Sequence, residues 1–422
     1  MAKGASITIP LDIPELRVVR VEQSHDGEYV LTVESLRTTT ACRRCGAVLT
    51  EVHGLETARR LRHLPIFGRP VYLQIRPKRF RCPHCSGNPT TTQRLDWYDP
   101  EALHTKAYER HLILTLINST ISDVVVKEDV SYDALLGILD RWVATTVDWK
   151  QVAPFAVLGI DEIALTKGHR NFVAVITAQT NQGLHVLAIL PDRLKATVLA
   201  WLQALPAERR AGITTVCTDI WEGYITAAQA ALPAATVVID RFHVARQYRQ
   251  AVDDLRKTEV RRLHQELPEA EQGDLKHTLW LVRKDPTDLT ADEQARLTAL
   301  FRHSLPLRQA HTLREELTRI FATARSKADG VRRIGFWRVR VVKSGLTCFD
   351  RFLTLLDTWL DLITNYFTDH QTSGFVEGLN NKLKVLKRRC YGLRNYQRLF
   401  QRLTLDVSGY RWFSPWRSTG HH

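Results

Sequence analysis

The pattern of apolar segments between residues 155 and 240 constrains the fold of this chain more than any other feature. Three strand-like runs, AVLGIDEIAL, NFVAVITAQ and LHVLAILP, follow one another with only short polar links between them. Next come a helical stretch (LKATVLAWLQALP), a strand (GITTVCTDI), a second helical stretch (EGYITAAQAAL) and a last strand (ATVVID). The order β-β-β-α-β-α-β predicts an α/β domain built on one mixed sheet.

Two acidic residues stand at the ends of apolar strands in this region. Asp161 ends the run AVLGI, and Asp219 ends the run ITTVCT. Acids at the carboxyl ends of adjacent central strands face a common crevice, where two carboxylates repel each other unless a cation lies between them. The pair therefore predicts a divalent metal site of the kind that serves phosphoryl transfer on DNA. Either acid alone is better explained as a turn residue. Glu162 should point to the opposite face of its strand, which makes it a weaker ligand candidate.

The cysteines fall into two closely spaced pairs and three single residues. Cys42-x-x-Cys45 and Cys82-x-x-Cys85 can each present two thiolates to one tetrahedral Zn²⁺ ion. Gly46 and Pro83 fit a tight knuckle, which needs unusual backbone geometry. A redox C-x-x-C motif and four unligated core thiols are the alternatives, and the paired spacing favours zinc over both. The single cysteines are expected to be packing residues; they are Cys217, Cys348 and Cys390.

Length and charge restrict the class of protein further. The chain has 422 residues, enough for two or more domains, and carries 59 Lys and Arg against 45 Asp and Glu, a net charge of +14. Such an excess suits a polyanionic partner, although ribosomal and membrane-surface proteins are also basic. We find no apolar run long enough to span a membrane and no secretory signal in the first ten residues. We therefore expect a cytoplasmic protein that does not bind a membrane.

Two further segments have features of nucleic-acid binding. Residues 101–147 are typical of three short helices, with Ser119 and Ser131 as expected N-caps, and they resemble a helix-turn-helix, although three helices also pack together for purely structural reasons. Residues 378–405 hold many Lys and Arg and no Asp or Glu, and include Tyr391 and Tyr396, which favours phosphate contact over a solvated face. The candidate DNA-binding residues are Lys382, Lys384, Lys387, Arg388, Arg389 and Arg394. Trp280 and Trp337 lie between residues 147 and 378. Stacking on an unpaired base is one interpretation of these two tryptophans, and core packing is favoured over it for each.

Several longer stretches resemble the ISL3 family of bacterial insertion-sequence transposases. They are GIDEIALTKGHRNFVAVIT at 159–177, VCTDIWEGY at 216–224, VVIDRFHVAR at 237–246 and TSGFVEGLNNKLKVLKRRCYGLRNYQRLFQRL at 372–403. CRRCG and RCPHC match the zinc ribbon of the family, so the resemblance covers nearly the whole chain. It implies a multidomain α/β protein with four parts. These are N-terminal strands with a four-cysteine zinc ribbon (1–98), a helix-turn-helix (99–150), an RNase H-like catalytic domain (151–246 and 346–408) and an all-helical insertion (247–345).

The resemblance also implies roles for individual residues. Glu377 becomes the third catalytic carboxylate beside Asp161 and Asp219, and the insertion accounts for its distance along the chain. Asp240 and His243 match a signature of the form [C/D]-x-x-H and are expected to orient the metal ligands or the DNA.

The implied activity is that of a DDE transposase with a two-metal mechanism. We expect it to bind double-stranded DNA at terminal inverted repeats, cleave it with Mg²⁺ or Mn²⁺, and join the freed end to target DNA. Zn²⁺ would be structural, and the protein would act at the bacterial nucleoid as at least a dimer, because two ends must be held together. The alternatives are a DNA-binding regulator or domesticated protein with an inactive nuclease fold, and a structure-specific nuclease or resolvase.

Overall fold

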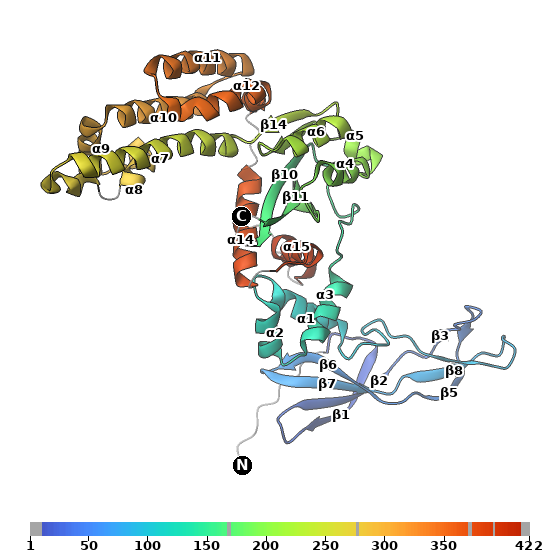
Figure 1. Ribbon diagram of the computed structural model, residues 1–422. Helices are drawn as coiled ribbons and strands as arrows, with labels where there is room; N and C mark the ends of the chain where they lie inside the picture. The colour runs from blue at the N-terminus through green and yellow to red at the C-terminus, as the bar shows by residue number, and fades with distance from the viewer. Residues whose placement is uncertain (1–10, 167–169, 276–277, 370–373, 391–392, 415–422) are drawn as a thin grey trace. The chain divides into compact units, whose positions relative to one another are not determined.

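The computed structural model describes residues 11–166, 170–275, 278–369, 374–390 and 393–414 (Figure 1). Within these ranges, nothing is described for the side chains of residues 170, 270, 273, 274, 278, 369, 374–377 and 380. The chain divides into two compact units, which are described separately below. One unit comprises Met1–Val143 and Ser408–His422, and the other comprises Ala144–Val407.

A four-stranded sheet forms the centre of the first unit. Strand β1 (Leu16–Gln23) pairs antiparallel with β2 (Tyr29–Ser35), and the turn between them contains Gly27 at a φ of 82°. Strand β2 runs parallel to β7 (Arg69–Ile75), which pairs antiparallel with β6 (Arg59–Ile66). Alternate residues of β2, β6 and β7 form the buried core on one face of the sheet. They are Leu31, Val33, Leu61, Val71, Leu73 and Ile75.

Five short strands flank the cysteine pairs. Strand β3 (Thr40–Ala41) pairs with β4 (Val48–Leu49), and the two enclose the first pair. Strands β5 (Val52–Leu55), β8 (Lys78–Arg81) and β9 (Thr90–Thr92) form a separate sheet in the order β5-β8-β9. The second pair lies between β8 and β9, so both pairs lie on tight connections between strands.

Three helices complete the first unit, namely α1 (Lys106–Leu116), α2 (Ile121–Glu128) and α3 (Tyr132–Trp142). The buried carboxylate of Glu109 in α1 accepts hydrogen bonds from Arg141 at 2.5 Å and from Trp142 Nε1 at 2.7 Å, which fixes the end of α3. Ser131 caps α3 as expected, but the prediction of Ser119 as the cap of α2 is wrong. The hydroxyl of Thr120 accepts a hydrogen bond from the Asp123 amide, so the helix begins one residue later.

The second unit is built on a five-stranded mixed sheet in the order β12-β11-β10-β13-β14. Strands β10 (Val157–Thr166), β11 (Arg170–Thr180) and β12 (Gly183–Ile189) form an antiparallel meander. Strands β13 (Thr215–Thr218) and β14 (Thr236–Ile239) then add to the other side of β10, each parallel to its neighbour. The mixed sheet predicted from the apolar pattern is therefore confirmed.

Helices cover both faces of this sheet (Figure 1). Alternation along β11 separates the faces, because Ala174 and Ile176 belong to one apolar cluster and Val173 and Val175 to the other. The first cluster includes residues of α4 (Lys195–Gln203) and α6 (Glu222–Ala231), which pack against each other, and the short α5 (Ala207–Ala211) follows α4. The second cluster includes residues of α14 (Gly374–Arg389) and α15 (Tyr396–Phe413).

The chain between β14 and α14 is almost entirely helical. Helix α7 (Arg241–Glu266) leaves the sheet at β14 and packs against α10 (Leu305–Thr323), and α11 (Lys327–Ser344) packs against α10 and α12 (Asp350–Thr364). The remaining α-helices of this segment are α8 (Thr278–Arg283), α9 (Ala291–His303) and α13 (Tyr366–Asp369), with 3₁₀ turns at Glu269–Leu275, Pro286–Asp288 and Thr347–Phe349. In the described part of the chain, no helix is both long and apolar enough to cross a membrane.

The two tryptophans of this helical segment have different surroundings. Trp337 is fully buried, packs edge-on against Phe349 and Phe352, and donates from Nε1 to the Leu313 carbonyl at 2.8 Å, as expected of a core residue. The same expectation for Trp280 is wrong, because its side chain is 67% exposed. The short helix α8 buries the neighbouring Leu281 and Val282 and leaves Trp280 on its outer face.

Candidate active site and metal centre

Three aspartates follow directly after the residues of β10, β13 and β14 that pair in parallel. Ile160 of β10 pairs with Thr218 of β13, and Thr218 pairs with Ile239 of β14. The residue that follows each of these in the chain is an aspartate, so the register brings Asp161, Asp219 and Asp240 to one level of the sheet. One detail of the prediction is wrong: Asp161 does not end its strand. Strand β10 continues to Thr166 because β11 still pairs with it, and only the pairing with β13 stops before Asp161.

The carboxylates of Asp161 and Asp219 are both buried, at 5% and 8% exposure. Asp161 Oδ1 accepts a hydrogen bond from the Glu162 amide at 2.6 Å, whereas Asp219 Oδ1 has no hydrogen-bond partner among the described residues. Burial, together with the charge of Asp161, raises the pKa of Asp219 to about 7, although the His243 imidazole opposes this shift. A buried carboxylate oxygen without a partner, beside a second carboxylate, fits a divalent cation with oxygen ligands.

Asp240 and His243 connect this site to helix α7. The Asp240 side chain caps the helix by accepting from the Phe242 amide at 3.1 Å, and the first turn then places His243 Nε2 3.9 Å from Asp161 Oδ2. Burial lowers the pKa of His243, but the interaction with Asp161 and the other nearby carboxylate charges outweigh it, so the net shift is upward. The Asp-x-x-His segment therefore lies in contact with a candidate metal ligand.

The predicted third carboxylate, Glu377, falls in α14, and its side chain lies outside the described residues. The helix itself packs on β10. The Lys387 ammonium donates to the Ala164 carbonyl, and the leucines at 379, 383 and 386 share an apolar cluster with Ile163. Ile163 and Asp161 are two residues apart and so lie on the same face of the strand. Helix α14 therefore covers the face of β10 to which Asp161 belongs.

A group that the sequence did not reveal lies beside Asp161 and Asp219. Glu162 is half-buried and forms an ion pair with Arg193 at 2.8 Å. The Arg193 guanidinium carbon lies 4.2 Å from the ring centres of both Phe172 and Trp221, so the cation is held by two aromatic rings as well. The sequence alone does not connect Arg193 with Glu162. The position of Trp221, two residues beyond Asp219, was the one sequence feature that could have pointed to this group.

The six predicted DNA-binding residues are in two kinds of environment. The side chains of Lys384, Arg388 and Arg394 are exposed. The other three have partners within the protein, as Lys382 donates to the Asp406 carbonyl, Lys387 to the Ala164 carbonyl and Arg389 to the Asp406 carboxylate. Arg402, in the same basic run, is buried, and Tyr391 lies outside the described residues.

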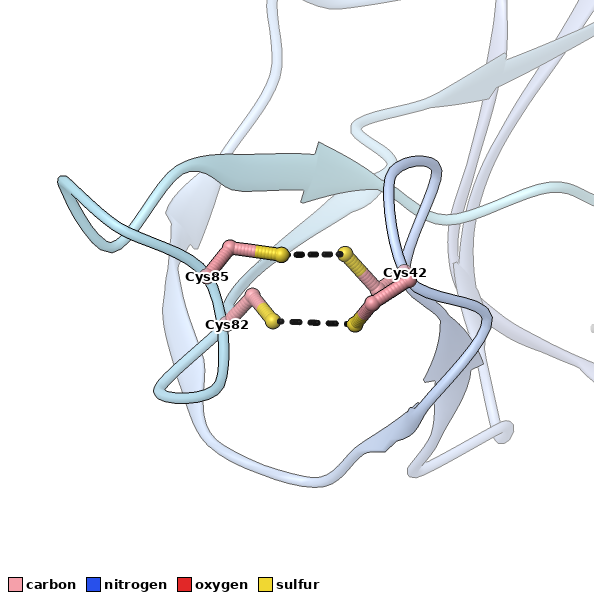
Figure 2. A group of neighbouring side chains, drawn as sticks. Cys42, Cys82 and Cys85 are labelled. Atoms are coloured by element: carbon pink, nitrogen blue, oxygen red, sulfur yellow. Dashed lines mark hydrogen bonds between the residues drawn. The ribbon is translucent and has the colours of Figure 1, made fainter.

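The four paired cysteines converge on one point in the first unit (Figure 2). Their sulfur atoms all lie within 4.8 Å of one another, with Cys42 and Cys85 4.0 Å apart and Cys45 and Cys82 3.7 Å apart. Gly46 adopts a φ of 73°, which permits the first knuckle, and backbone amides of Cys45 and Arg44 lower the pKa of the Cys42 thiol to about 6. Four thiols in this arrangement fit one tetrahedral Zn²⁺ ion.

The single cysteines occupy apolar surroundings, as expected. Cys217 is buried in the core of the second unit, and its pKa is raised to about 12 by burial. Cys348 and Cys390 are half-buried against apolar clusters.

Comparison with known proteins identifies the class of protein to which this arrangement belongs. Residues 158–403 match the ISL3 model of transposases, and residues 38–85 match the zinc finger of transposases of IS204, IS1001, IS1096 and IS1165. The chain is 29% identical over 398 residues to the transposase for insertion sequence element IS1001 of Bordetella parapertussis, which covers 93% of this chain and 95% of the relative. It is 23% identical over 423 residues to the transposase for IS1557 of Mycobacterium tuberculosis, covering 94% of each. The protein is thus a transposase, and it belongs to the ISL3 family of insertion-sequence transposases.

Proposed function

We propose that this transposase binds the terminal inverted repeats of its insertion sequence and catalyses metal-dependent strand cleavage and strand transfer. Asp161, Asp219 and Glu377 are the proposed catalytic carboxylates. The single observation that carries the proposal is the register of β10 and β13, which places two buried acids side by side and leaves Asp219 Oδ1 without a partner among the described residues. A site of this composition suits Mg²⁺ or Mn²⁺.

The roles of the surrounding residues follow from their contacts. The cations held by the three carboxylates would supply activation of the attacking oxygen and stabilisation of the leaving oxygen in an in-line displacement. His243 orients the Asp161 carboxylate and limits the repulsion between Asp161 and Asp219. Asp240 holds His243 in place by capping the helix that carries it.

The arrangement of the second unit supports an RNase H-like catalytic domain at 151–246 and 346–408. Its sheet combines an antiparallel meander with two parallel strands, and α14, which carries Glu377, packs on the central strand. The helices between β14 and α14 would then be the insertion assigned to 247–345. This insertion begins after β14, the last strand of the sheet, so it does not interrupt the order of the strands. The chain returns to the sheet at α14, the helix that contains Glu377.

The first unit would recognise DNA. Zinc bound by the four cysteines would fix the ribbon within 1–98, and α1 to α3 would form the helix-turn-helix of 99–150. The sharp turn at Asp129, at a φ of 50°, and the 50% exposed Tyr132 at the start of α3 support this role, because the second helix of such a motif enters the major groove with its N-terminal residues. At least a dimer would hold the two element ends together, at the bacterial nucleoid.

The proposal is tested by incubating the protein with an element end and target DNA in Mg²⁺ and scoring cleavage and joining. Wild type should cut the end and join its 3′-hydroxyl to the target, and Asp161→Ala should bind the end without cutting it. Binding by wild type without cleavage would support a DNA-binding regulator instead. Cleavage without joining would support a structure-specific nuclease.

A further inference from the structure

A hollow of about 510 Å³ in the second unit is lined in part by Arg193, the ion-pair partner of Glu162. Its lining includes Leu165 of β10, Phe172 and Arg193, and also Arg394 and Tyr396 from the chain at the start of α15. The lining therefore combines residues of two strands and of the loop after β12 with residues of the C-terminal basic run. It also contains one acid, Asp192, whose carboxylate accepts a hydrogen bond from the Leu194 amide at 2.9 Å. Its volume is in the range of pockets that hold small organic ligands, roughly 300–1,000 Å³.

The side chain of Arg193 is fixed in the wall of this hollow before any ligand arrives. Glu162 binds its guanidinium at 2.8 Å, and the rings of Phe172 and Trp221 lie 4.2 Å from it. Both anchors are close in the chain to the candidate metal ligands, because Glu162 follows Asp161 and Trp221 lies two residues beyond Asp219. A cation held in this way loses little conformational entropy when it binds a phosphate.

The C-terminal basic run contributes an aromatic ring and a second cation to the lining. Tyr396 is half-buried against the apolar cluster under α15, which fixes its ring, and Arg394 is exposed two residues earlier. An aromatic ring and two guanidinium groups in the lining of one hollow suit a nucleotide, because the base stacks on the ring and the phosphate pairs with the cations.

Only an unpaired nucleotide could use this hollow. A base within a duplex is held in the stack, whereas a base in an unpaired strand end can leave it at low cost. Leu165 lies four residues beyond Asp161 along β10, roughly 13 Å at about 3.3 Å per residue. This distance equals the rise of about four base pairs of duplex at roughly 3.4 Å each, so it spans at most about four nucleotides of an unpaired strand, which extends further per nucleotide.

We propose that the hollow binds one unpaired nucleotide of the DNA end, within about four nucleotides of the reacting phosphate, with its base stacked on Tyr396 and its phosphate held by Arg193 and Arg394. This inference rests on the proposed function, since it assumes that a DNA end reaches Asp161 and Asp219. The nucleotide subsite would hold the strand end in register while the carboxylates act on it.

The test measures binding of the full-length protein without added Mg²⁺ or Mn²⁺, so that no cleavage is required. Fluorescence anisotropy compares two element-end duplexes with a four-nucleotide unpaired extension, one with bases and one abasic throughout. Wild type should bind the base-bearing extension on the order of tenfold more tightly, given the usual worth of one base stacked on an aromatic ring. A single abasic position moved along the extension should produce most of the loss at one nucleotide.

Matched variants separate the stacking contact from the phosphate contacts. Tyr396→Ala should abolish the preference for bases, and Tyr396→Phe, which keeps the ring, should retain it. Arg394→Ala should weaken binding of both duplexes equally. Lys343→Ala, an exposed change on α11, should alter neither value. Circular dichroism and thermal midpoints verify that each variant is folded.

Two outcomes would overturn the inference. Equal binding of base-bearing and abasic extensions by wild type would show that no base is held, and a preserved preference in Tyr396→Ala would place the base elsewhere. Failure of the proposed function gives a different result, seen in the cleavage assay. Wild type would then bind the element end without cutting it, or Asp161→Ala would cleave and join DNA as well as wild type, whatever the extension.

Discussion

The two candidate metal sites of this transposase are built in contrasting ways. The thiol site takes its ligands from two short knuckles, and its four sulfur atoms already lie within 4.8 Å of one another. The carboxylate site takes its candidates from separate strands and from a helix more than a hundred residues further along the chain. A site made of short loops can be predicted from the spacing of its residues in the sequence. A site made of residues at strand ends can be predicted only when the register of the sheet is known.

The two sites also differ in what holds their surroundings together. The apolar cluster around the cysteines contains only Leu49 and Phe80 besides the cysteines themselves, among the residues that the structure describes. The aspartates lie on a sheet with large apolar clusters on both faces. We therefore expect the thiol site to need its metal in order to fold, and the carboxylate site to need its metal only for chemistry.

Removal of zinc should have the largest effect on stability. Cys82→Ser should lose the bound zinc and unfold residues 38–92, because structural zinc contributes about 10–16 kcal/mol in small zinc-finger peptides. Elemental analysis reports the zinc, and limited proteolysis reports the unfolding. Cys348→Ser is the matched control and should keep the zinc. Equal protease resistance of Cys82→Ser and wild type would show that the cluster folds without a metal.

Loss of one carboxylate should remove catalysis and leave the fold intact. Asp219→Asn should reduce the rate of single-turnover cleavage by at least about a thousandfold, because a metal ligand is worth several kcal/mol in the transition state. Glu377→Gln should behave alike if its side chain joins the site. The thermal midpoint of metal-free Asp219→Asn should rise, since the substitution removes a buried charge that Asp161 repels. A drop in stability together with normal cleavage would contradict both expectations.

The same contrast explains how far the sequence could predict this structure. The spacing of Cys42, Cys45, Cys82 and Cys85 was sufficient to predict the thiol cluster, and the apolar pattern was sufficient for the mixed sheet. The continuation of β10 past Asp161 was not predictable, because it depends on pairing with β11. The internal partners of Lys382, Lys387 and Arg389 were not predictable either. These partners are Ala164 and Asp406, and only the packing of α14 on β10 and α15 brings them close.

His243 should have an intermediate effect on the carboxylate site. His243→Ala removes the imidazole 3.9 Å from Asp161 and should reduce cleavage by about 10- to 100-fold, the usual cost of losing a group that orients a metal ligand. The Mn²⁺ concentration needed for half-maximal cleavage should rise in parallel. An unchanged metal requirement would assign His243 to DNA contact instead.

The exposed cations of α14 should have the smallest effect. In the double variant Lys384→Ala and Arg388→Ala, the slope of log affinity against log salt concentration should fall by the equivalent of about two phosphate contacts. Cleavage of bound DNA should stay unchanged. Anisotropy titrations at several salt concentrations give this slope. Lys343→Ala, at an exposed position on α11, is the control and should keep the wild-type slope. If the double variant also kept the wild-type slope, the α14 surface would be excluded from DNA binding.

The central claim, that Asp161 and Asp219 hold a divalent cation together, is tested most directly by Mn²⁺ binding to the zinc-loaded protein. Electron paramagnetic resonance counts the free Mn²⁺ during a titration of wild type, Asp161→Asn, Asp219→Asn and the double variant. If the acids share the ion, each single variant should lose as much affinity as the double variant, because either change destroys the same site. Single variants that bind Mn²⁺ as tightly as wild type would contradict the account.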